Sequence, residues 1–214
     1  MAMTTVNTCV VKPKFRLLRP KRVLDLAICV VMLPAVLPVL GAAAAAVALT
    51  SKGSVFFVQE RVGRGGHTFS MYKLRSMSSD AEARRAQVEQ LNEREGLCVK
   101  VKHDPRITPV GRFLRRWSLD ELPQLINVLL GDMSIVGPRP ALVCEVAKYP
   151  DHAHQRHAVL PGITGLWQVS GRADVGFDEM ISMDVEYVRR VSVATDVSIL
   201  LRTLGAVVSG RGAY

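Results

Sequence analysis

Aromatic side chains are scarce in this chain: six Phe, two Trp and four Tyr make up 6% of its 214 residues. No segment interleaves them with basic residues as single-strand and RNA-binding modules do, so nucleic acid is not the expected partner. The formal net charge of +9 favours other acidic partners, namely phosphorylated substrates or phospholipid headgroups.

Cysteine and histidine form no disulfide or metal-binding pattern. The four cysteines are scattered through the sequence: Cys9, Cys29, Cys98 and Cys144. Three histidines lie close together in the sequence: His152, His154 and His157. No helical face presents these three together, and no Cys or carboxylate completes a zinc site. The cysteine spacing favours a reducing compartment.

Charge is absent from residues 26–49, a run rich in Val, Leu and Ala. A helix of that length reaches about 36 Å, and a bilayer core is about 30 Å thick, so the run predicts a membrane helix. Six basic residues precede Asp25: Lys12, Lys14, Arg16, Arg19, Lys21 and Arg22. The positive-inside rule places this side of the run in the cytoplasm.

Prolines distinguish this run from a simple membrane span. Pro34 and Pro38 each remove a backbone donor, and small residues follow at 41–46. Basic residues continue beyond the run, which favours both flanks on one face. We therefore expect a re-entrant helix at 23–50 that breaks at these prolines and returns to the cytoplasmic side. A plain span and a cleaved signal peptide ending near 42–44 are the alternatives.

The rest of the sequence predicts one cytoplasmic domain at 51–214, preceded by a basic segment at 1–22. Strand signals occur at 54–59 and 68–74, on either side of a glycine-rich turn at 63–66. The expected fold class is α+β and mostly helical, with one β-hairpin and with helices lying on the membrane surface.

Capping signals and apolar periodicity locate the helices. A capping box opens a polar helix at 79–96, and Thr108-Pro109 begins another. Ser118 begins a further helix with Pro123 near its first turn. Residues 177–190 are expected to be helical. The next and last helix carries an apolar stripe, which we interpret as core, with contact with the membrane surface as the alternative. The stripe consists of Val197, Leu200, Leu201, Leu204, Val207 and Val208.

Asp120 and Glu121 are the strongest candidates for chemistry. Adjacent acids at a helix start commonly cap backbone donors, so their surroundings decide the interpretation. Four arginines lie near them in the sequence: Arg112, Arg115, Arg116 and Arg139. Prolines on both sides of Arg139 fix its backbone, so the guanidinium can be held ready for a phosphate oxygen. At a helix start one carboxylate is expected to stay ionised as a nucleophile, while its neighbour can bind a hard divalent cation. The pattern therefore predicts phosphoryl transfer.

Motifs in a fixed order extend over most of the chain. Around the acid pair they read Ser118-Leu119-Asp120-Glu121-Leu122-Pro123, then Gly131-Asp132-Met133-Ser134, then Val136-Gly137-Pro138-Arg139-Pro140. Others are Lys21-Arg22 with Asp25, Gln59-Glu60-Arg61-Val62-Gly63, Tyr72-Lys73-Leu74-Arg75, Pro161-Gly162-Ile163-Thr164-Gly165, and Ser209-Gly210-Arg211-Gly212-Ala213-Tyr214. Together they resemble the bacterial sugar transferase family, the monotopic phosphoglycosyl transferases that initiate exopolysaccharide and glycoconjugate assembly.

The resemblance implies roles for individual residues. Asp120 is implied to be the nucleophile that attacks the sugar-bearing phosphate, and Glu121 the ligand of Mg²⁺. The expected substrate-binding residues are Arg115, Arg139, Arg172, Lys73, Arg75, Arg112 and Gln168. One position departs from the family, because Leu37 stands before Pro38 where Ser is frequent. A hydroxyl that could satisfy freed backbone groups is therefore missing at the bend.

The implied reaction transfers hexose-1-phosphate from a UDP-sugar to undecaprenyl phosphate and releases UMP, through a covalent aspartyl-phosphosugar intermediate. The resemblance places this activity at the cytoplasmic face of the bacterial inner membrane, in contact with membrane lipid. The sequence names no sugar, and it leaves a homo-oligomer open. The alternative is a non-catalytic, membrane-tethered scaffold of polysaccharide assembly, for which Asp120→Asn would have no effect on lipid-linked product.

Two further acids, Asp184 and Asp196, fall at positions where the family also has acids, and capping and salt bridging account for them equally well. Trp167 is interpreted as core rather than as a stacking platform for uridine.

Overall fold

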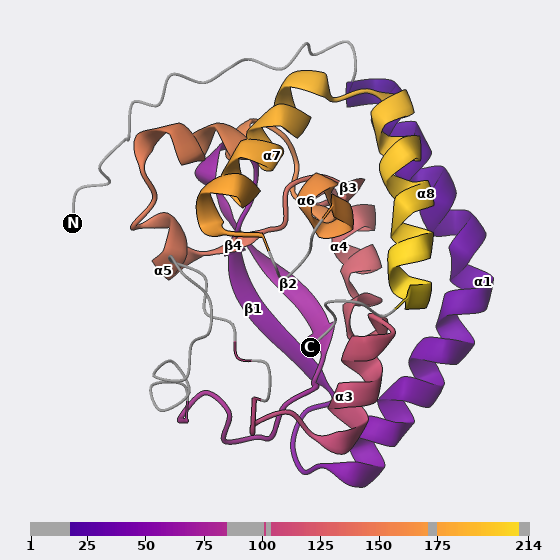
Figure 1. The fold of residues 1–214 in the computed structure, drawn as a ribbon. Coiled ribbons are helices and arrows are strands. Elements are labelled where there is room, and N and C mark those ends of the chain that lie inside the picture. The colour runs from indigo at the N-terminus through magenta and orange to yellow at the C-terminus, as the bar shows by residue number, and fades with distance from the viewer. Residues whose placement is uncertain (1–17, 85–100, 102–103, 171–174, 210–214) are drawn as a thin grey trace.

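The computed structural model describes residues 18–84, 101, 104–170 and 175–209. Within these ranges the chain is mostly helical, with one antiparallel sheet of three short strands and one parallel pair. The predicted α+β class is therefore confirmed. Figure 1 shows the long helix α1 on one side of the molecule, with the β-hairpin and the shorter helices packed against it.

Helix α1, Leu18–Thr50, begins five residues before the expected start at residue 23. It remains helical through Pro34 and Pro38. Because each proline removes one backbone N–H and crowds the preceding turn, a change of direction is expected there. Figure 1 shows α1 bending about halfway along its length. The bend agrees with the prediction, whereas re-entry into the same membrane face stays a prediction.

Most of α1 is not covered by protein. Its buried apolar side chains form one stripe: Cys29, Val36, Ala43 and Val47. Among the described residues, Arg19–Thr50 is the one helix long and apolar enough to cross a membrane, and only 17% of its most apolar window is buried. A core helix of a water-soluble protein would be covered on most sides, so the exposure of α1 favours lipid as its surroundings.

The β-hairpin is confirmed. Strand β1, Phe56–Val62, pairs antiparallel with β2, Thr68–Leu74. The first strand was predicted at 54–59, so it begins and ends later than expected, whereas the bounds of the second are as predicted. The 3-10 turn η2, Arg64–Gly66, connects them, with positive φ at Gly65 and Gly66. Only glycine adopts that backbone freely, which explains the glycine cluster. A short third strand, β4 at Ala141–Leu142, pairs with β1.

The acid pair lies between two short helices. Helix α3, Pro109–Arg116, begins as predicted, with the Thr108 side chain accepting from Gly111 N. The single helix predicted from Ser118 is wrong, because residues Leu119–Glu121 form a separate 3-10 turn, η3, before α4 at Gln124–Leu130. Pro123 has no N–H to donate to Leu119 O, which accepts instead from Leu122 N at 3.3 Å, the i to i+3 pattern of a 3-10 turn. Ser118 makes no side-chain cap and has a φ of 54°.

The remaining elements complete the domain. The parallel pair consists of β3, Ser134–Val136, and β5, Gly162–Thr164. Helices then follow as α5 Val143–Val146, the 3-10 helix η4 Asp151–Ala158, α6 Leu166–Ser170, α7 Phe177–Arg190 and α8 Val193–Ser209. The prediction for α7 is confirmed to the residue. Of the predicted helix at 79–96, residues 79–84 form turns and 85–96 lie outside the described residues.

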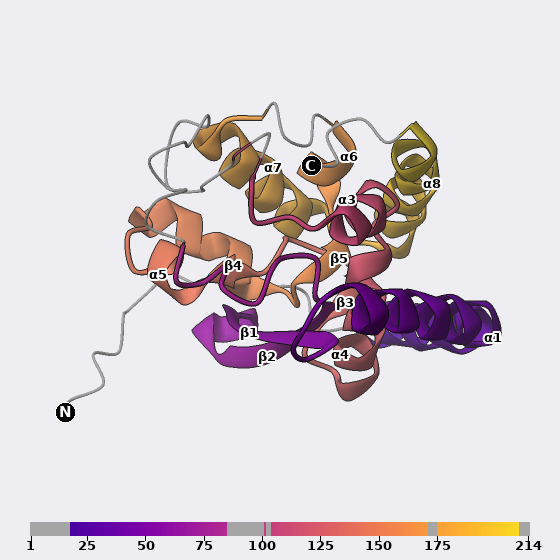
Figure 2. The same ribbon diagram turned by 90° about the horizontal axis from the view of Figure 1, so that it is seen from below.

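The prediction that the apolar stripe on α8 is core is wrong for four of its six residues, since Val197, Leu201, Leu204 and Val208 are exposed. Leu200 packs against the core, beside the buried Asp196 and Ile199. Periodicity identified an apolar face but could not say what would cover it. Figures 1 and 2 show α8 running beside α1 at the edge of the molecule, so its outer face meets no other element. Trp167, by contrast, is buried in a core cluster with Phe177, as predicted.

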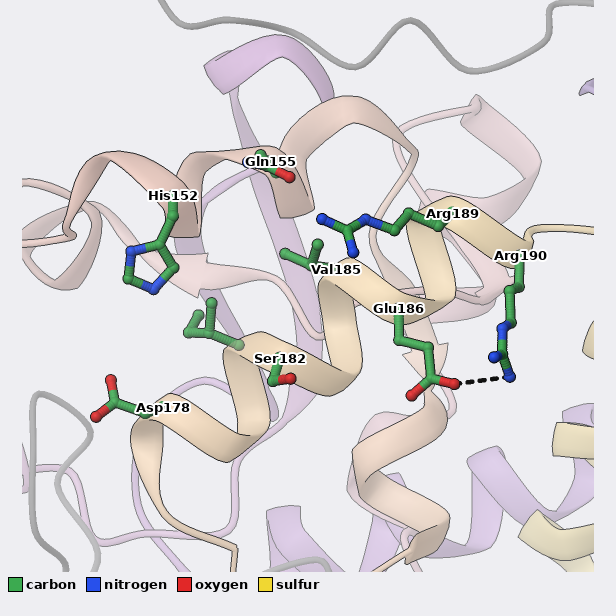
Figure 3. A pocket seen from close by; sticks show the side chains of 9 residues that line it. His152, Gln155, Asp178, Ser182, Val185, Glu186, Arg189 and Arg190 are labelled. Atoms are coloured by element: carbon green, nitrogen blue, oxygen red, sulfur yellow. Dashed lines mark ion pairs between the residues drawn. The ribbon is translucent and has the colours of Figure 1, made fainter.

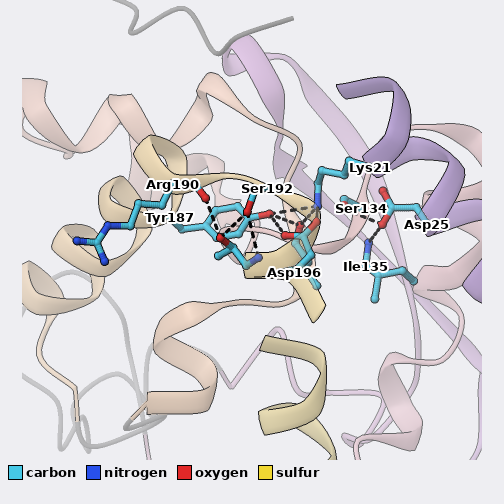
Figure 4. Close-up of polar contacts among 10 residues, drawn as sticks. Lys21, Asp25, Ser134, Ile135, Tyr187, Arg190, Ser192 and Asp196 are labelled. Atoms are coloured by element: carbon cyan, nitrogen blue, oxygen red, sulfur yellow. Dashed lines mark hydrogen bonds and ion pairs between the residues drawn. The ribbon is translucent and has the colours of Figure 1, made fainter. Parts of the chain in front are cut away.

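Buried polar contacts anchor α1 to the domain. Lys21 forms an ion pair of 2.5 Å with Asp196 of α8, and both side chains are at most 5% exposed (Figure 4). The salt bridge expected for Asp196 is thus confirmed. Removing one partner from a buried pair leaves an uncompensated charge in a medium that solvates it poorly.

We expect Lys21→Met to lower the free energy of unfolding by about 3–5 kcal/mol, because it strands the Asp196 carboxylate. The double variant Lys21→Met/Asp196→Asn should recover most of the loss, since neither member of the ion pair then remains as an unpaired charge. Urea unfolding of the three proteins in the same lipid nanodiscs measures both effects. Equal stability of wild type and Lys21→Met would contradict this account.

Candidate active site

Asp120 and Glu121 lie in η3, between α3 and α4. Asp120 is buried, and the Glu121 side chain is 16% exposed. Ser118, two residues before Asp120, is the one non-glycine residue with positive φ among those described. A left-handed serine costs free energy and persists only where surrounding contacts fix it, which is common at functional sites.

Glu121 is held by two cations from distant parts of the chain. Lys73 Nζ of β2 and Arg139 Nη2 each lie 3.0 Å from Glu121 Oε1. Burial raises the pKa of Glu121, but the charges of Arg139 and Lys73 outweigh it, and the net pKa lies well below the usual value. Glu121 is therefore a carboxylate at neutral pH, and its two partners are cations ready for further anionic groups.

Asp120 experiences the opposite balance. Burial raises its pKa, the neighbouring charge of Glu121 raises it further, and Lys73, Arg115 and Arg139 counteract both only in part. The sequence interpretation expected a helix start to keep this carboxylate readily ionised. The structure provides instead a three-residue 3-10 turn, whose dipole is small, so desolvation prevails. A buried carboxylate with few water molecules around it is a stronger nucleophile once deprotonated.

The other arginines predicted near the pair occupy different places. Arg115 Nε donates to Ser76 Oγ at 2.9 Å, and its charge acts on Asp120. Arg112 is exposed on α3. Arg75 Nη2 donates to the backbone oxygen and the hydroxyl of Ser51 at 2.8 Å each, at the end of α1. The structure therefore places Arg115 near the acid pair, whereas Arg75 points toward the end of α1.

Two further residues predicted to bind substrate are Gln168 and Arg172. Gln168 Nε2 of α6 donates to Ile163 O at 3.2 Å. Arg172 lies outside the described residues. Their roles stay predictions.

Arg61 is a site cation that the sequence interpretation missed. Burial and then the charge of Arg139 lower the pKa of Arg61 to about 10, and Glu121 acts on it in the opposite sense. Its Nη1 donates to Pro140 O at 3.1 Å. In the antiparallel register Phe57 faces Lys73, so alternation along β1 places Arg61 on the same face as Lys73. That register, combined with the alternation, is the signal that could have identified it.

Arg156, which lies between His154 and His157 in the sequence, is a second residue of the site that the sequence did not predict. Its Nη2 donates to Arg139 O at 2.8 Å and lies 2.6 Å from Asp184 Oδ2. Both side chains of this ion pair are buried, which confirms the salt bridge expected for Asp184. The pair thus fixes the backbone of the residue that holds Glu121. The neighbouring His157 ring stacks on Tyr149.

The described residues contain no group of three or more His, Cys, Asp or Glu side chains that could form a metal cage. A divalent ion at Glu121 would therefore take most of its ligands from substrate phosphates and water, as Mg²⁺ commonly does. The adjacent carboxylates of Asp120 and Glu121 are hard oxygen donors, so they fit that ion.

A cavity lies elsewhere, between η4 and α7, with a volume of about 620 Å³ (Figure 3). Its polar lining carries both signs of charge, including an ion pair of 2.8 Å between Glu186 and Arg190. None of its lining residues belongs to the acid pair or to the cations around it. The cavity and the candidate active site are therefore separate places on the molecule.

Comparison with known proteins agrees with this geometry. The chain is 48% identical to the galactosyl transferase CpsE of Streptococcus agalactiae over 75% of its own length and 36% of that protein. It is 43% identical to the undecaprenyl-phosphate galactose phosphotransferase of Salmonella typhimurium over 76% of its length and 35% of that protein. It is 38% identical to the exopolysaccharide production protein ExoY of Sinorhizobium fredii over 91% of its length and 88% of that protein.

The chain thus spans about a third of the length of the first two relatives and most of ExoY. The sequence pattern that describes bacterial sugar transferases matches residues 16–210, which include α1, the acid pair and every cation around it. Since this match takes in nearly the whole chain, the protein belongs to the bacterial sugar transferase family.

Proposed function

We propose that this protein transfers hexose-1-phosphate from a UDP-sugar to undecaprenyl phosphate and releases UMP. The observation that carries the proposal is a buried acid pair in which Lys73 and Arg139 hold Glu121 at 3.0 Å while Asp120 remains beside it. Two relatives support the substrates: the UDP-glucose:undecaprenyl-phosphate glucose-1-phosphate transferases of Escherichia coli and of Xanthomonas campestris.

In the first step, an oxygen of the Asp120 carboxylate attacks the phosphorus that bears the sugar. The bond from that phosphorus to the bridging oxygen breaks, and UMP leaves with the electron pair. The sugar phosphate is then an acyl phosphate on Asp120. An oxygen of undecaprenyl phosphate attacks the same phosphorus in the second step and frees the carboxylate, so every bond formed is matched by one broken.

The cations around the pair supply the charge stabilisation that phosphoryl transfer needs. The charges of Lys73, Arg115 and Arg139 act on Asp120, so these residues are proposed to stabilise the negative charge that develops on the transferred phosphate and on the leaving nucleotide. Gln168 and Arg172 are proposed as nucleotide contacts on the grounds of family resemblance. Glu121 would hold Mg²⁺, which neutralises the diphosphate when bound.

The membrane arrangement is part of the proposal. The bend of α1 near its middle supports a re-entrant helix, with both of its ends on the cytoplasmic face of the bacterial inner membrane. The exposed apolar faces of α1 and α8 lie side by side and would both contact lipid. Such a position brings the site to the membrane level at which the phosphate of a lipid carrier lies.

The nucleotide released identifies the reaction. With Mg²⁺, undecaprenyl phosphate and a panel of UDP-sugars in nanodiscs, we expect the wild type to release UMP. Asp120→Asn should reduce the rate at least about a thousandfold, because the nucleophile is lost. Asp178→Asn, a matched change at an exposed position of α7, should leave the rate unchanged. Release of UDP would exclude the aspartyl intermediate, and no release from any UDP-sugar would favour the scaffold.

The role of Glu121 is tested by metal titration. Chelation of divalent ions should abolish UMP release, and Glu121→Gln should raise the Mg²⁺ concentration for half-maximal rate by roughly tenfold, because an anionic ligand becomes neutral. The measurement is the initial rate as a function of free Mg²⁺. An unchanged Mg²⁺ requirement in Glu121→Gln would remove this residue as a ligand.

Re-entry is tested by labelling both ends of α1. In a protein whose native cysteines are replaced, Arg19→Cys and Lys52→Cys place single thiols on exposed positions at either end of the helix. A membrane-impermeant maleimide should label both in inside-out vesicles and neither in right-side-out vesicles. A plain span would give labelling of the two positions from opposite sides.

A further inference from the structure

The start of α1 contacts β3 and α4, the two elements that lie next to Arg139 and to the acid pair in the chain. We infer that Lys21, Arg22 and Asp25 are positioning residues, which couple the seating of the membrane helix to the geometry of the active site. The inference rests on the proposed function for its kinetic consequence, and on hydrogen bonds for its structural one. Figure 4 shows Lys21 and Asp25 pointing from α1 toward β3 and α8.

Lys21 uses three donors on three buried partners. Its Nζ donates to Val136 O at 2.8 Å, to Tyr187 Oη at 3.1 Å and to Asp196 Oδ2 at 2.5 Å. Tyr187 Oη in turn donates to Asp196 Oδ1 at 2.7 Å. An ammonium has three N–H groups, so Lys21 is fully satisfied and its orientation is fixed.

Asp25 lies one helical turn further along α1. Its Oδ1 accepts from Ile135 N and from Ser134 Oγ, both at 3.0 Å. Lys21 and Asp25 together therefore bind each of the three residues of β3. These contacts are buried, so moving α1 along its axis would leave charged and backbone groups without partners.

Arg22 reaches the other segment. Its Nη1 and Nη2 donate to Val128 O and Leu129 O, in the last turn of α4, at 2.5 and 3.0 Å. Val128 O also accepts from Gly131 N at 3.1 Å, whereas Leu129 O is one of the last carbonyls, which lack a partner within the helix, so the guanidinium caps the end of α4. Helix α4 begins three residues after Glu121, so α1 also holds the element that follows the acid pair.

The backbone between β3 and Arg139 is held by hydrogen bonds and close packing. Gly137 N donates to Thr164 O at 2.8 Å, and Gly162 N donates to Pro138 O at 2.9 Å. A Cβ on Gly137 would lie 2.5 Å from Leu160 O, so β5 packs directly against this backbone. Pro138 fixes its own φ. A displacement of Val136 is therefore transmitted to Arg139, whose guanidinium holds Glu121.

The chemistry of the cluster favours positioning over stability alone. A buried ion pair often contributes no more stability than apolar residues of similar volume, but it does require one geometry. Lys21 and Asp196 are 175 positions apart in the chain, and both side chains are nearly inaccessible. The cluster thus selects one seating of α1, and that seating sets the distance from Arg139 to the acid pair.

The test uses variants that remove the hydrogen bonds between α1 and β3 without leaving one member of the Lys21–Asp196 ion pair unpaired. Asp25→Ala deletes the acceptor for Ser134 and Ile135, and Asp25→Asn retains an acceptor oxygen. Lys21→Met/Asp196→Asn removes the bond to Val136 O while keeping the buried charge balanced. Val23→Ala changes an exposed residue of the same helix turn and is the control.

Two readouts are measured in nanodiscs, with the variants' melting temperatures as a check of folding. In Asp25→Ala and in the double variant, we expect hydrogen exchange at residues 134–139 to rise at least about tenfold, with β1 and β2 unchanged. The kcat for UMP release should fall about tenfold to a hundredfold, with KM for the UDP-sugar changing much less. Asp25→Asn should regain most of the rate, and Val23→Ala should match wild type.

The outcomes separate the two proposals. Folded variants with wild-type exchange at 134–139 would overturn the positioning role, whatever their activity. Wild-type kcat in folded variants whose exchange has risen would overturn the coupling to the active site. A wild type that releases no UMP would refute the proposed function, while the exchange measurement would still decide whether α1 positions β3.

Discussion

Two adjacent carboxylates beneath the surface can exist only if cations reach them, and this constraint organises the fold. Glu121 is compensated by Lys73 from β2 and by Arg139 from the segment after β3, each at 3.0 Å. Both cations belong to elements other than the turn that carries Glu121. The hairpin and the β3–β5 pair must therefore be in place before the acid pair can be buried, because an uncompensated buried charge is costly.

Sequence patterns predicted what depends on neighbours along the chain. The Thr108 cap, the bounds of α7, the hairpin and the acid pair itself all have local signals. Contacts across the chain have none: Lys73 and Glu121 are 48 positions apart, and nothing near either residue specifies the other. The same limit explains Arg61 and Arg156, which become site residues only once strand register and the η4 packing are known.

Two predictions about helices failed for different reasons. The helix expected from Ser118 is divided because Pro123 cannot donate to Leu119 O, which accepts from Leu122 N in a 3-10 pattern, and because Ser118 itself is left-handed. The stripe on α8 was read as core since apolar periodicity normally marks the covered face. In this molecule the covered face of α8 presents Asp196 and Ile199 instead.

Helix α8 buries a charged residue and exposes apolar ones because α1 and α8 together have different surroundings on their two sides. On the side toward the domain, α1 and α8 carry Lys21 and Asp196, whose charges are paired with each other. On the outer side they expose apolar residues, with Leu201 and Leu204 each 66% exposed. In water this distribution would be unfavourable on both sides, through desolvated charge and uncovered apolar surface. A lipid environment removes the second cost, while ion pairing offsets the first. The polar anchor can therefore fix the helices to the domain while their apolar faces fix the domain to a bilayer.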